Sequence, residues 1–307
     1  MISQYSFTKI ALFFGLLGAV AESNPLDFTA DPAISLTNNT VRNIRCGTEV
    51  LDRLRLMAVE DQFLLDQQAA PDFQDTGVLN INVYWHIIRQ DKTTAGGNLS
   101  PDQVRAQMDV LNSDFGGAIN WTLASAEWVT NAAWFNNAAP GTSEQSEMKM
   151  ALKKGGMRDL NVYTVGFNSG QAQYLLGYAS FPYAFKSNPT DDGIVIRFTT
   201  LPGGNEPYAN LGRTATHEAG HWAGLYHTFQ GGCSSPGDYV TDTPPEASGA
   251  SGCPKDRKSC PGKDASVDPI HNFMDYSDDS CMTQFTPEQV KRMFAQLSTY
   301  RSIRSTV

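Results

Sequence analysis

The sequence is short of positive charge. It holds 23 Lys and Arg residues against 32 Asp and Glu residues, which gives a formal net charge of −9. Nucleic-acid binding needs a basic face that neutralises phosphates, so this balance argues against a nucleic-acid partner. Repeats and low-complexity tracts are also lacking. With 41% hydrophobic and 18% charged residues, the chain can bury a core, and its length allows one large domain or a domain with an appendage.

Long apolar runs are almost absent. The exception, "IALFFGLLGAVA" from Ile10 to Ala21, follows Lys9 and is too short to span a bilayer. It ends in small residues, which predicts a secretory signal peptide, residues 1–21, cut after Ala21. No later stretch predicts a transmembrane helix. We therefore expect an extracellular protein with no membrane partner, and we expect it to be a monomer.

Cysteine is scarce and its number is odd. In an oxidising compartment five cysteines leave one over. Four lie in the last quarter of the chain, so the simplest expectation is two disulfides there. The cysteines are Cys46, Cys233, Cys253, Cys260 and Cys281. Three Asn-x-Ser/Thr triplets are candidate glycosylation sites of a secreted chain. They begin at Asn38, Asn98 and Asn120.

The stretch from residue 22 to 77 predicts a pro-segment and linker. It starts with a polar, turn-rich part, continues with a helical pattern at 49–68, and ends in the linker "AAPDFQDTG". The helical pattern rests on Val50, Leu51, Leu54, Met57, Phe63 and Leu64. Apolar residues are too few here for a separate core. The segment must therefore dock on the rest of the chain or be removed.

Residues 78–307 predict the main domain, with an α+β fold. Strands and helices alternate first, and an irregular stretch rich in Gly, Pro, Ser and Asp follows. A loop that long needs a covalent or metal framework. We expect a twisted, mixed and mostly parallel sheet with helices, plus an irregular, disulfide-tied C-terminal subdomain. The expected strands are 78–88, 159–167 and 192–201, the expected helices 100–115, 212–225 and 286–301, and the irregular stretch 228–275.

The stretch "TATHEAGHWAGLYHTF" carries three of the five histidines. His217 and His221 are four residues apart, so both imidazoles leave one face of a helix, where they can bind one Zn²⁺. Glu218 lies beside them as a candidate general base. Gly224 can end the helix with a positive φ and so return His227 to the metal. The alternative is an ordinary histidine-rich helix. It does not account for the spacing of His217, Glu218, His221, Gly224 and His227.

The motif "HEAGHWAGLYH", followed by Met274 in "NFMDYSDDSC", resembles the metzincin signature. Together with "GDYVTDTPP" and the four late cysteines, it resembles the pappalysin family, with greatest likeness to secreted fungal metalloproteases. The likeness covers roughly residues 78–294. It implies His217, His221 and His227 as zinc ligands and Glu218 as base. It also implies a metzincin-type protease domain.

The resemblance has further implications for individual residues. Met274 would form the floor of the metal site. Tyr276 would stabilise the tetrahedral intermediate, although a packing role is the alternative. The disulfide pairs would be Cys233–Cys260 and Cys253–Cys281. Calcium would bind near the "GDYVTDTPP" turn, where a solvated acidic turn is equally compatible with the residues. Its oxygen ligands would come from Asp238, Asp242 and Thr243.

Cys46, in "RCGTEV", resembles a latency cysteine whose thiolate occupies the open zinc position of a precursor. An incidental free cysteine is the alternative. Together these features predict a secreted zinc endopeptidase for protein or peptide substrates, made as a latent precursor. The substrate would pair with residues 191–204 as the sheet edge, and Asp278 or Asp279 would favour a basic residue after the scissile bond. A zinc module without catalysis and a hydrolase of non-peptide amides remain rival functions.

Overall fold

The computed structural model describes residues 44–69, 77–262 and 265–304. They belong to one compact unit, Pro32–Val307. The predicted signal peptide, residues 1–21, and the candidate glycosylation site Asn38 lie outside the described residues.

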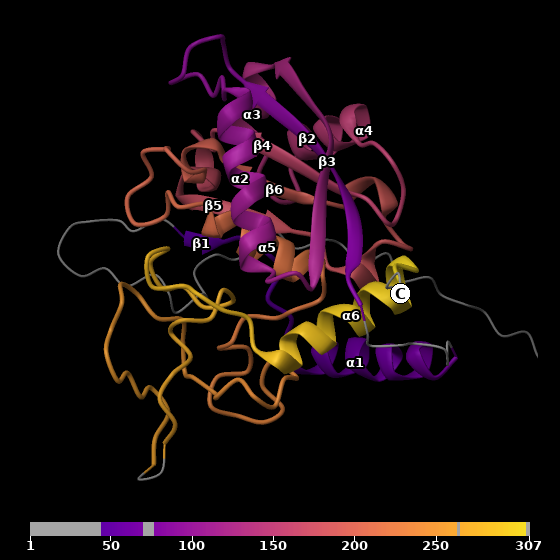
Figure 1. Cartoon of the computed structure of the whole chain (residues 1–307), viewed down its shortest axis with the longest axis vertical. Helices are drawn as coiled ribbons and strands as arrows, with labels where there is room; N and C mark the ends of the chain where they lie inside the picture. Colours follow the sequence, from indigo (N-terminus) through magenta and orange to yellow (C-terminus); the bar gives the residue numbers. More distant parts are fainter. Residues whose placement is uncertain (1–43, 70–76, 263–264, 305–307) are drawn as a thin grey trace, which may run out of the picture. The chain divides into compact units, whose positions relative to one another are not determined.

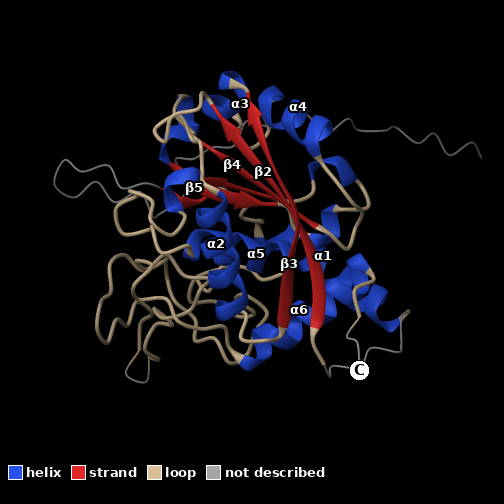
Figure 2. Cartoon of the chain, turned by 45° about the horizontal axis from the view of Figure 1, so that its top comes forward, coloured by secondary structure: helices blue, strands red, loops and turns tan. Residues whose placement is uncertain are grey.

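A six-stranded mixed sheet forms the centre of the part that the structure describes (Figures 1 and 2), in the order β1-β5-β6-β4-β2-β3. Every neighbouring pair is parallel except β5 and β6. This confirms the expected α+β architecture with a mostly parallel sheet. The strands are β1 (Ile44–Cys46), β2 (Leu79–Arg89), β3 (Ile119–Thr130), β4 (Leu160–Val165), β5 (Leu175–Ala179) and β6 (Ile194–Arg197).

The expected sheet edge is wrong. Residues 191–204 contain β6, which lies between β5 and β4 inside the sheet. Its Ile194, Val195 and Ile196 are all buried, and such continuous burial is typical of an interior strand. The strand next to the edge is β5, and β1 covers it in parallel, with Cys46 opposite Gly177. The segment predicted as pro-segment thus supplies the outermost strand.

The helices begin where the sequence provides caps. Ser100 caps α2 in a capping box with Gln103, and Thr286 caps α6 in the same way with Gln289. Helices α2 and α5 pack against each other and against the sheet, and Trp85, Trp121 and Trp222 are among the residues they bury. The helices are α1 (Arg53–Gln68), α2 (Pro101–Asp114), α3 (Ala132–Asn137), α4 (Ser143–Leu152), α5 (Arg213–Trp222) and α6 (Pro287–Arg301).

Helix α1 packs beside α6 with only part of its apolar pattern turned inward, because Leu51 and Phe63 of that pattern are buried (Figure 1). Its buried residues are Leu56, Glu60 and Phe63. The expected contact residues Val50, Leu54, Met57 and Leu64 are exposed. The physical reason is an ion pair: the Glu60 carboxylate binds the Arg292 guanidinium of α6 and turns that face inward.

The chain between α5 and α6 is irregular, as expected (Figure 2). Two disulfides hold it, Cys233–Cys260 and Cys253–Cys281, which are the pairs that the resemblance implies. Cys46 is free and buried. Among the described residues, none of the helices has the length and apolar character needed to cross a bilayer.

Candidate metal centre and catalytic site

Three imidazoles meet at the end of α5. His217 and His221 leave one face of the helix, which ends at Trp222. Gly224 then adopts a φ of 102°, in the left-handed region that favours glycine. The chain turns back and brings His227 to the other two. The Nε2 atom of His221 lies 3.2 Å from that of His217 and 3.1 Å from that of His227.

The outer ring nitrogens show which atoms face inward as acceptors. Nδ1 of His217 donates to the Phe273 carbonyl at 2.7 Å, and Nδ1 of His221 donates to the Leu225 carbonyl at 2.8 Å. Burial lowers the pKa of His221 to about 4, so its ring is neutral. The converging Nε2 atoms therefore present lone pairs, which repel one another unless a cation lies between them. Three such nitrogens, two of them on rings oriented by carbonyls, fit a tetrahedral zinc site with a fourth position open.

Met274 lies under the metal-binding helix and is fully buried. Its sulfur is so close to Gly220 that a Cβ at that position would stand 2.5 Å from it. The amide of Met274 donates to the side chain of Asn272, which also exchanges hydrogen bonds with Gln289 of α6. The contacts at Gly220 and Asn272 were not expected from the sequence, because both residues act through partners distant along the chain.

Glu218 is buried against strand β5. One carboxylate oxygen, Oε2, accepts hydrogen bonds from the Thr48 hydroxyl at 3.0 Å and from the Cys46 thiol at 3.4 Å. Burial raises the pKa of this carboxyl to about 8. A Cβ on Gly177 would come within 2.9 Å of the Glu218 side chain, so this strand position has to be glycine for the carboxylate to fit.

The sulfur of Cys46 joins the histidine trio, because all four ligand atoms lie within 4.8 Å of one another. Burial, followed by the nearby Glu218 charge, raises the pKa of the thiol. Tyr276 lies at the same place, with its ring centroid 5.0 Å from that of His227 and its hydroxyl donating to the Cys46 carbonyl at 3.4 Å. The structure thus brings Cys46 and Tyr276 to the histidines.

Next to the centre, Arg45 forms a buried ion pair with Asp279 at 2.5 Å. The other oxygen of Asp279 accepts from the amides of Leu211 and Arg213. Asp278 is half-buried. The basic side chain of Arg45 thus contacts Asp279, one of the two candidate pocket residues.

The candidate calcium residues do not all converge. Asp238 is buried, and its carboxylate accepts from the Thr243 hydroxyl at 2.8 Å and from the Val240 amide at 3.1 Å. Burial raises the pKa of Asp238 to about 6. Asp242 instead accepts from the Glu288 amide at the start of α6. The structure therefore brings Asp238 and Thr243 together and assigns Asp242 to helix capping.

The remaining candidates lie apart from the centre. Asn120 is exposed on the edge strand β3, and its amide donates to Asn80. Asn98 is half-buried, and its side-chain oxygen accepts from Arg89. His86 contacts Glu127 and Asn161 through its two ring nitrogens inside the sheet.

Comparisons with known proteins agree with this site. The family model described as Peptidase_M43, pregnancy-associated plasma protein-A, matches residues 147–298. An extracellular metalloprotease of Verticillium alfalfae is 38% identical over 98% of this chain and 100% of its own length. One of Neurospora crassa is 39% identical over 89% of this chain and 94% of its own length.

Two solved structures from Tannerella forsythia also resemble this chain. A mutant of promirolysin has a TM-score of 0.66 and 27% identity, covering 84% of this chain and 95% of that chain. Mature mirolysin in complex with a cleaved peptide has a TM-score of 0.60 and 27% identity, covering 73% of this chain and 97% of that chain. The chain is therefore a metalloprotease that acts on proteins or peptides. It belongs to the pappalysin family, together with the extracellular metalloproteases of fungi.

Proposed function

We propose that this chain is a secreted zinc endopeptidase made as a latent precursor. The observation that carries the proposal is that Nε2 of His221 lies within 3.2 Å of Nε2 of both His217 and His227, beside a buried glutamate. His217, His221 and His227 would hold the zinc. When bound, the ion would supply Lewis-acid polarisation of the scissile carbonyl and lower the pKa of a bound water to about 7.

The protein groups divide the remaining work. Glu218, once free of the pro-segment, accepts a proton from the attacking water and delivers it to the leaving nitrogen. The Tyr276 hydroxyl donates a hydrogen bond to the developing oxyanion. Met274 supports the helix that carries two of the ligands.

Latency would arise from residues 22–77. Cys46 faces the metal position, and β1 fills the place along β5 where a substrate would pair. The comparisons support this reading, because promirolysin covers 84% of this chain whereas mature mirolysin covers 73%. Activation would remove the signal peptide and the pro-segment and leave residues 78–307 as the catalytic domain.

Asp279 would select a basic residue directly after the scissile bond. The support is Arg45, whose guanidinium already pairs with Asp279 beside the metal position. Arg45 precedes Cys46 in the chain, so the N-terminal part of the pro-segment lies on the Asp279 side of the cleft. This is the side that would hold the substrate residues after the scissile bond. A substrate, which has its C-terminal part there, would run in the opposite direction.

Secretion, glycosylation and calcium complete the proposal. Extracellular relatives support secretion, and glycans would be carried at Asn38, Asn98 and Asn120.

Calcium would bind at Asp238 and Thr243, where a buried carboxylate lacks a cationic partner among its hydrogen-bond donors. After chelation, zinc and calcium together should restore the full Tm. Full recovery with zinc alone would refute the calcium site.

The decisive test is cleavage of casein by the activated enzyme, with and without a zinc chelator, for the wild type and for Glu218→Gln. We expect the chelator to abolish cleavage and the variant to lose about 10²–10⁴-fold in kcat while still binding zinc. Wild-type turnover by the variant would refute the mechanism. A zinc-loaded wild type that cleaves no protein would favour the non-catalytic module or the hydrolase of non-peptide amides.

A further inference from the structure

The Glu60 carboxylate is bound by three donors of the main domain. Arg292 contributes Nη1 at 3.0 Å and Nη2 at 2.6 Å, and the Tyr226 hydroxyl contributes a third hydrogen bond at 2.8 Å. Glu60 lies on α1, within the segment that activation would remove. Release of α1 would therefore leave a guanidinium and a phenol without their shared partner.

These donors are held in place independently of Glu60. Nε of Arg292 donates to the carbonyl of Gly224 at 3.0 Å, and the guanidinium lies over the Tyr226 ring, 4.9 Å from its centroid. The other carboxylate near Arg292 is that of Asp238, which already accepts from Thr243 and the Val240 amide. The arrangement is thus a pre-organised receptor for one incoming carboxylate, of the bidentate type that arginine favours.

The receptor adjoins the catalytic cleft. Tyr226 directly precedes His227, and its ring packs on Phe181, which in turn packs on His221. Phe181 follows strand β5, which β1 of the pro-segment covers. Leu51 of the pro-segment is buried in this aromatic cluster, and its carbonyl accepts from Gln230. Arg45 lies in the opposite half of the cleft, so this end faces substrate residues that precede the scissile bond.

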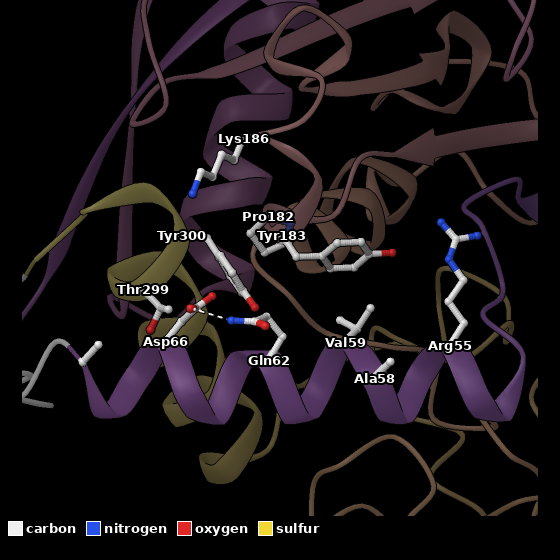
Figure 3. Close-up of a pocket in the computed structure, with 11 residues that line it drawn as sticks. Arg55, Ala58, Val59, Gln62, Asp66, Pro182, Tyr183, Lys186, Thr299 and Tyr300 are labelled. Atoms are coloured by element: carbon white, nitrogen blue, oxygen red, sulfur yellow. Dashed lines mark hydrogen bonds between the residues drawn. The ribbon is translucent and has the colours of Figure 1, made fainter. Parts of the chain in front are cut away.

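The packing of α1 is also incomplete. A cavity of about 640 Å³ lies between α1 and the chain after β5 (Figure 3). Tyr183 and Tyr300 line it from the main domain, while Val59 and Gln62 line it from α1. This pocket is open to solvent, so α1 buries less surface against the main domain here and fewer contacts must break when it leaves.

We propose that Arg292 and Tyr226 form, in the activated enzyme, a recognition site for an acidic side chain of the substrate on the amino-terminal side of the scissile bond. The surface around Phe181 takes an apolar residue between that acid and the cleavage point. This inference rests on the proposed function, because α1 must depart before the site can be reached.

The test uses enzyme activated from the full chain, with mass spectrometry showing that residues 44–69 have been lost. Paired peptides share a basic residue after the scissile bond and a leucine before it, and they differ by Glu or Gln. The varied position is scanned over about three to eight residues before the bond, because an extended chain spans roughly 3.3–3.6 Å per residue.

We expect kcat/KM to be about tenfold higher for the Glu peptide at the best position. The preference for the Glu peptide should vanish in Arg292→Gln and shrink in Tyr226→Phe. The second variant removes only a hydroxyl, so it tests the site even if Arg292→Gln does not fold. Arg105→Gln, at an exposed position of α2, should keep the preference. Equal cleavage of both peptides at every position would overturn the inference, whereas failure to cleave any peptide would overturn the proposed function.

Discussion

The Thr48 hydroxyl donates to the Glu218 carboxylate at 3.0 Å and accepts from the Ala179 amide at 2.8 Å. It therefore links the proposed general base to the strand that would bind substrate. Cys46, two residues earlier, faces the three histidines. Cys46 contacts both the metal position and Glu218, whereas Thr48 contacts Glu218 without reaching the histidines, so a substitution at Thr48 weakens the contact with the base alone.

Substitution at Cys46 and Thr48 should weaken latency to different extents. Cys46→Ala removes the sulfur from the metal position and should give a precursor with early activity. Thr48→Val removes the hydrogen bond to the Glu218 carboxylate, about 1.5–3 kcal/mol, and also the acceptor of the Ala179 amide, so the segment should bind at least roughly ten- to a hundredfold more weakly. The measurement is peptide cleavage by the uncleaved precursor, whose intact mass is checked in parallel. Thr94→Val, on an exposed loop, serves as the control, and unchanged latency in Cys46→Ala would count against the switch.

Gly224→Val should reduce zinc affinity although Gly224 contacts no ligand. The residue has a φ of 102°, and a Cβ there would stand 2.5 Å from Cγ of Gln296. Both effects displace the turn that returns His227 to the site. We expect the zinc dissociation constant to rise at least about tenfold, equivalent to 1.4 kcal/mol, in a titration against chelator buffers.

The control for this turn is Gly141→Val. Gly141 has a φ of 78°, and a Cβ there meets no atom within 4 Å. In this variant a valine also has to adopt a left-handed backbone conformation, but away from the metal position. If both variants kept wild-type zinc affinity, the role assigned to the turn would be mistaken.

Asp279→Asn should relax the preference for a basic residue after the scissile bond. An asparagine keeps an acceptor for the Leu211 and Arg213 amides but loses the charge that pairs with Arg45. The wild type should favour Arg over Leu at that position by about ten- to a hundredfold in kcat/KM, and the variant by much less. Peptide-library cleavage measures the ratio. Asp278→Asn is the matched control, and an unaltered preference in Asp279→Asn would exclude this pocket.

The histidine trio could be predicted from sequence because its geometry is local. His217, His221 and Gly224 lie within one helix and its end, where residue spacing determines direction. The caps at Ser100 and Thr286 are local for the same reason. The disulfide pairing and Met274 depended on the family resemblance, because spacing alone leaves three pairings open.

The contacts that sequence reasoning missed are all long-range. Glu60 meets Arg292 across 232 positions, and Thr48 meets Glu218 across 170. An apolar pattern gives no sign that a buried carboxylate will orient α1, so it does not distinguish the exposed Leu54 from the buried Phe63. The edge was misassigned to β6 because a run such as Ile194–Ile196 carries no information about its neighbours in a sheet. Strand order depends on tertiary pairing, which β1 completes from outside the expected domain.

Glu246 should make the folded protein less stable as the pH rises. It is buried, and it accepts from Thr228 at 2.6 Å and from Arg257 at 2.9 Å. Burial first, and the charge of Asp275 second, raise its pKa from 4.5 to about 8. Between these values the folded state binds more protons than the unfolded state. Stability therefore falls as the pH rises through this window, by up to about 1.4 kcal/mol per pH unit.

The measurement compares the wild type with Glu246→Gln, which keeps an acceptor but cannot ionise. The Tm of the wild type minus that of the variant should decrease steadily from pH 5 to pH 8 and stay constant below pH 4, where the carboxyl is protonated in both states. The zinc content is kept equal in the two proteins, so that the difference reports Glu246, together with its effect on the neighbouring Asp275, and not a loss of metal. A Tm difference that rises over this range would show that the Arg257 ion pair outweighs burial at this carboxyl.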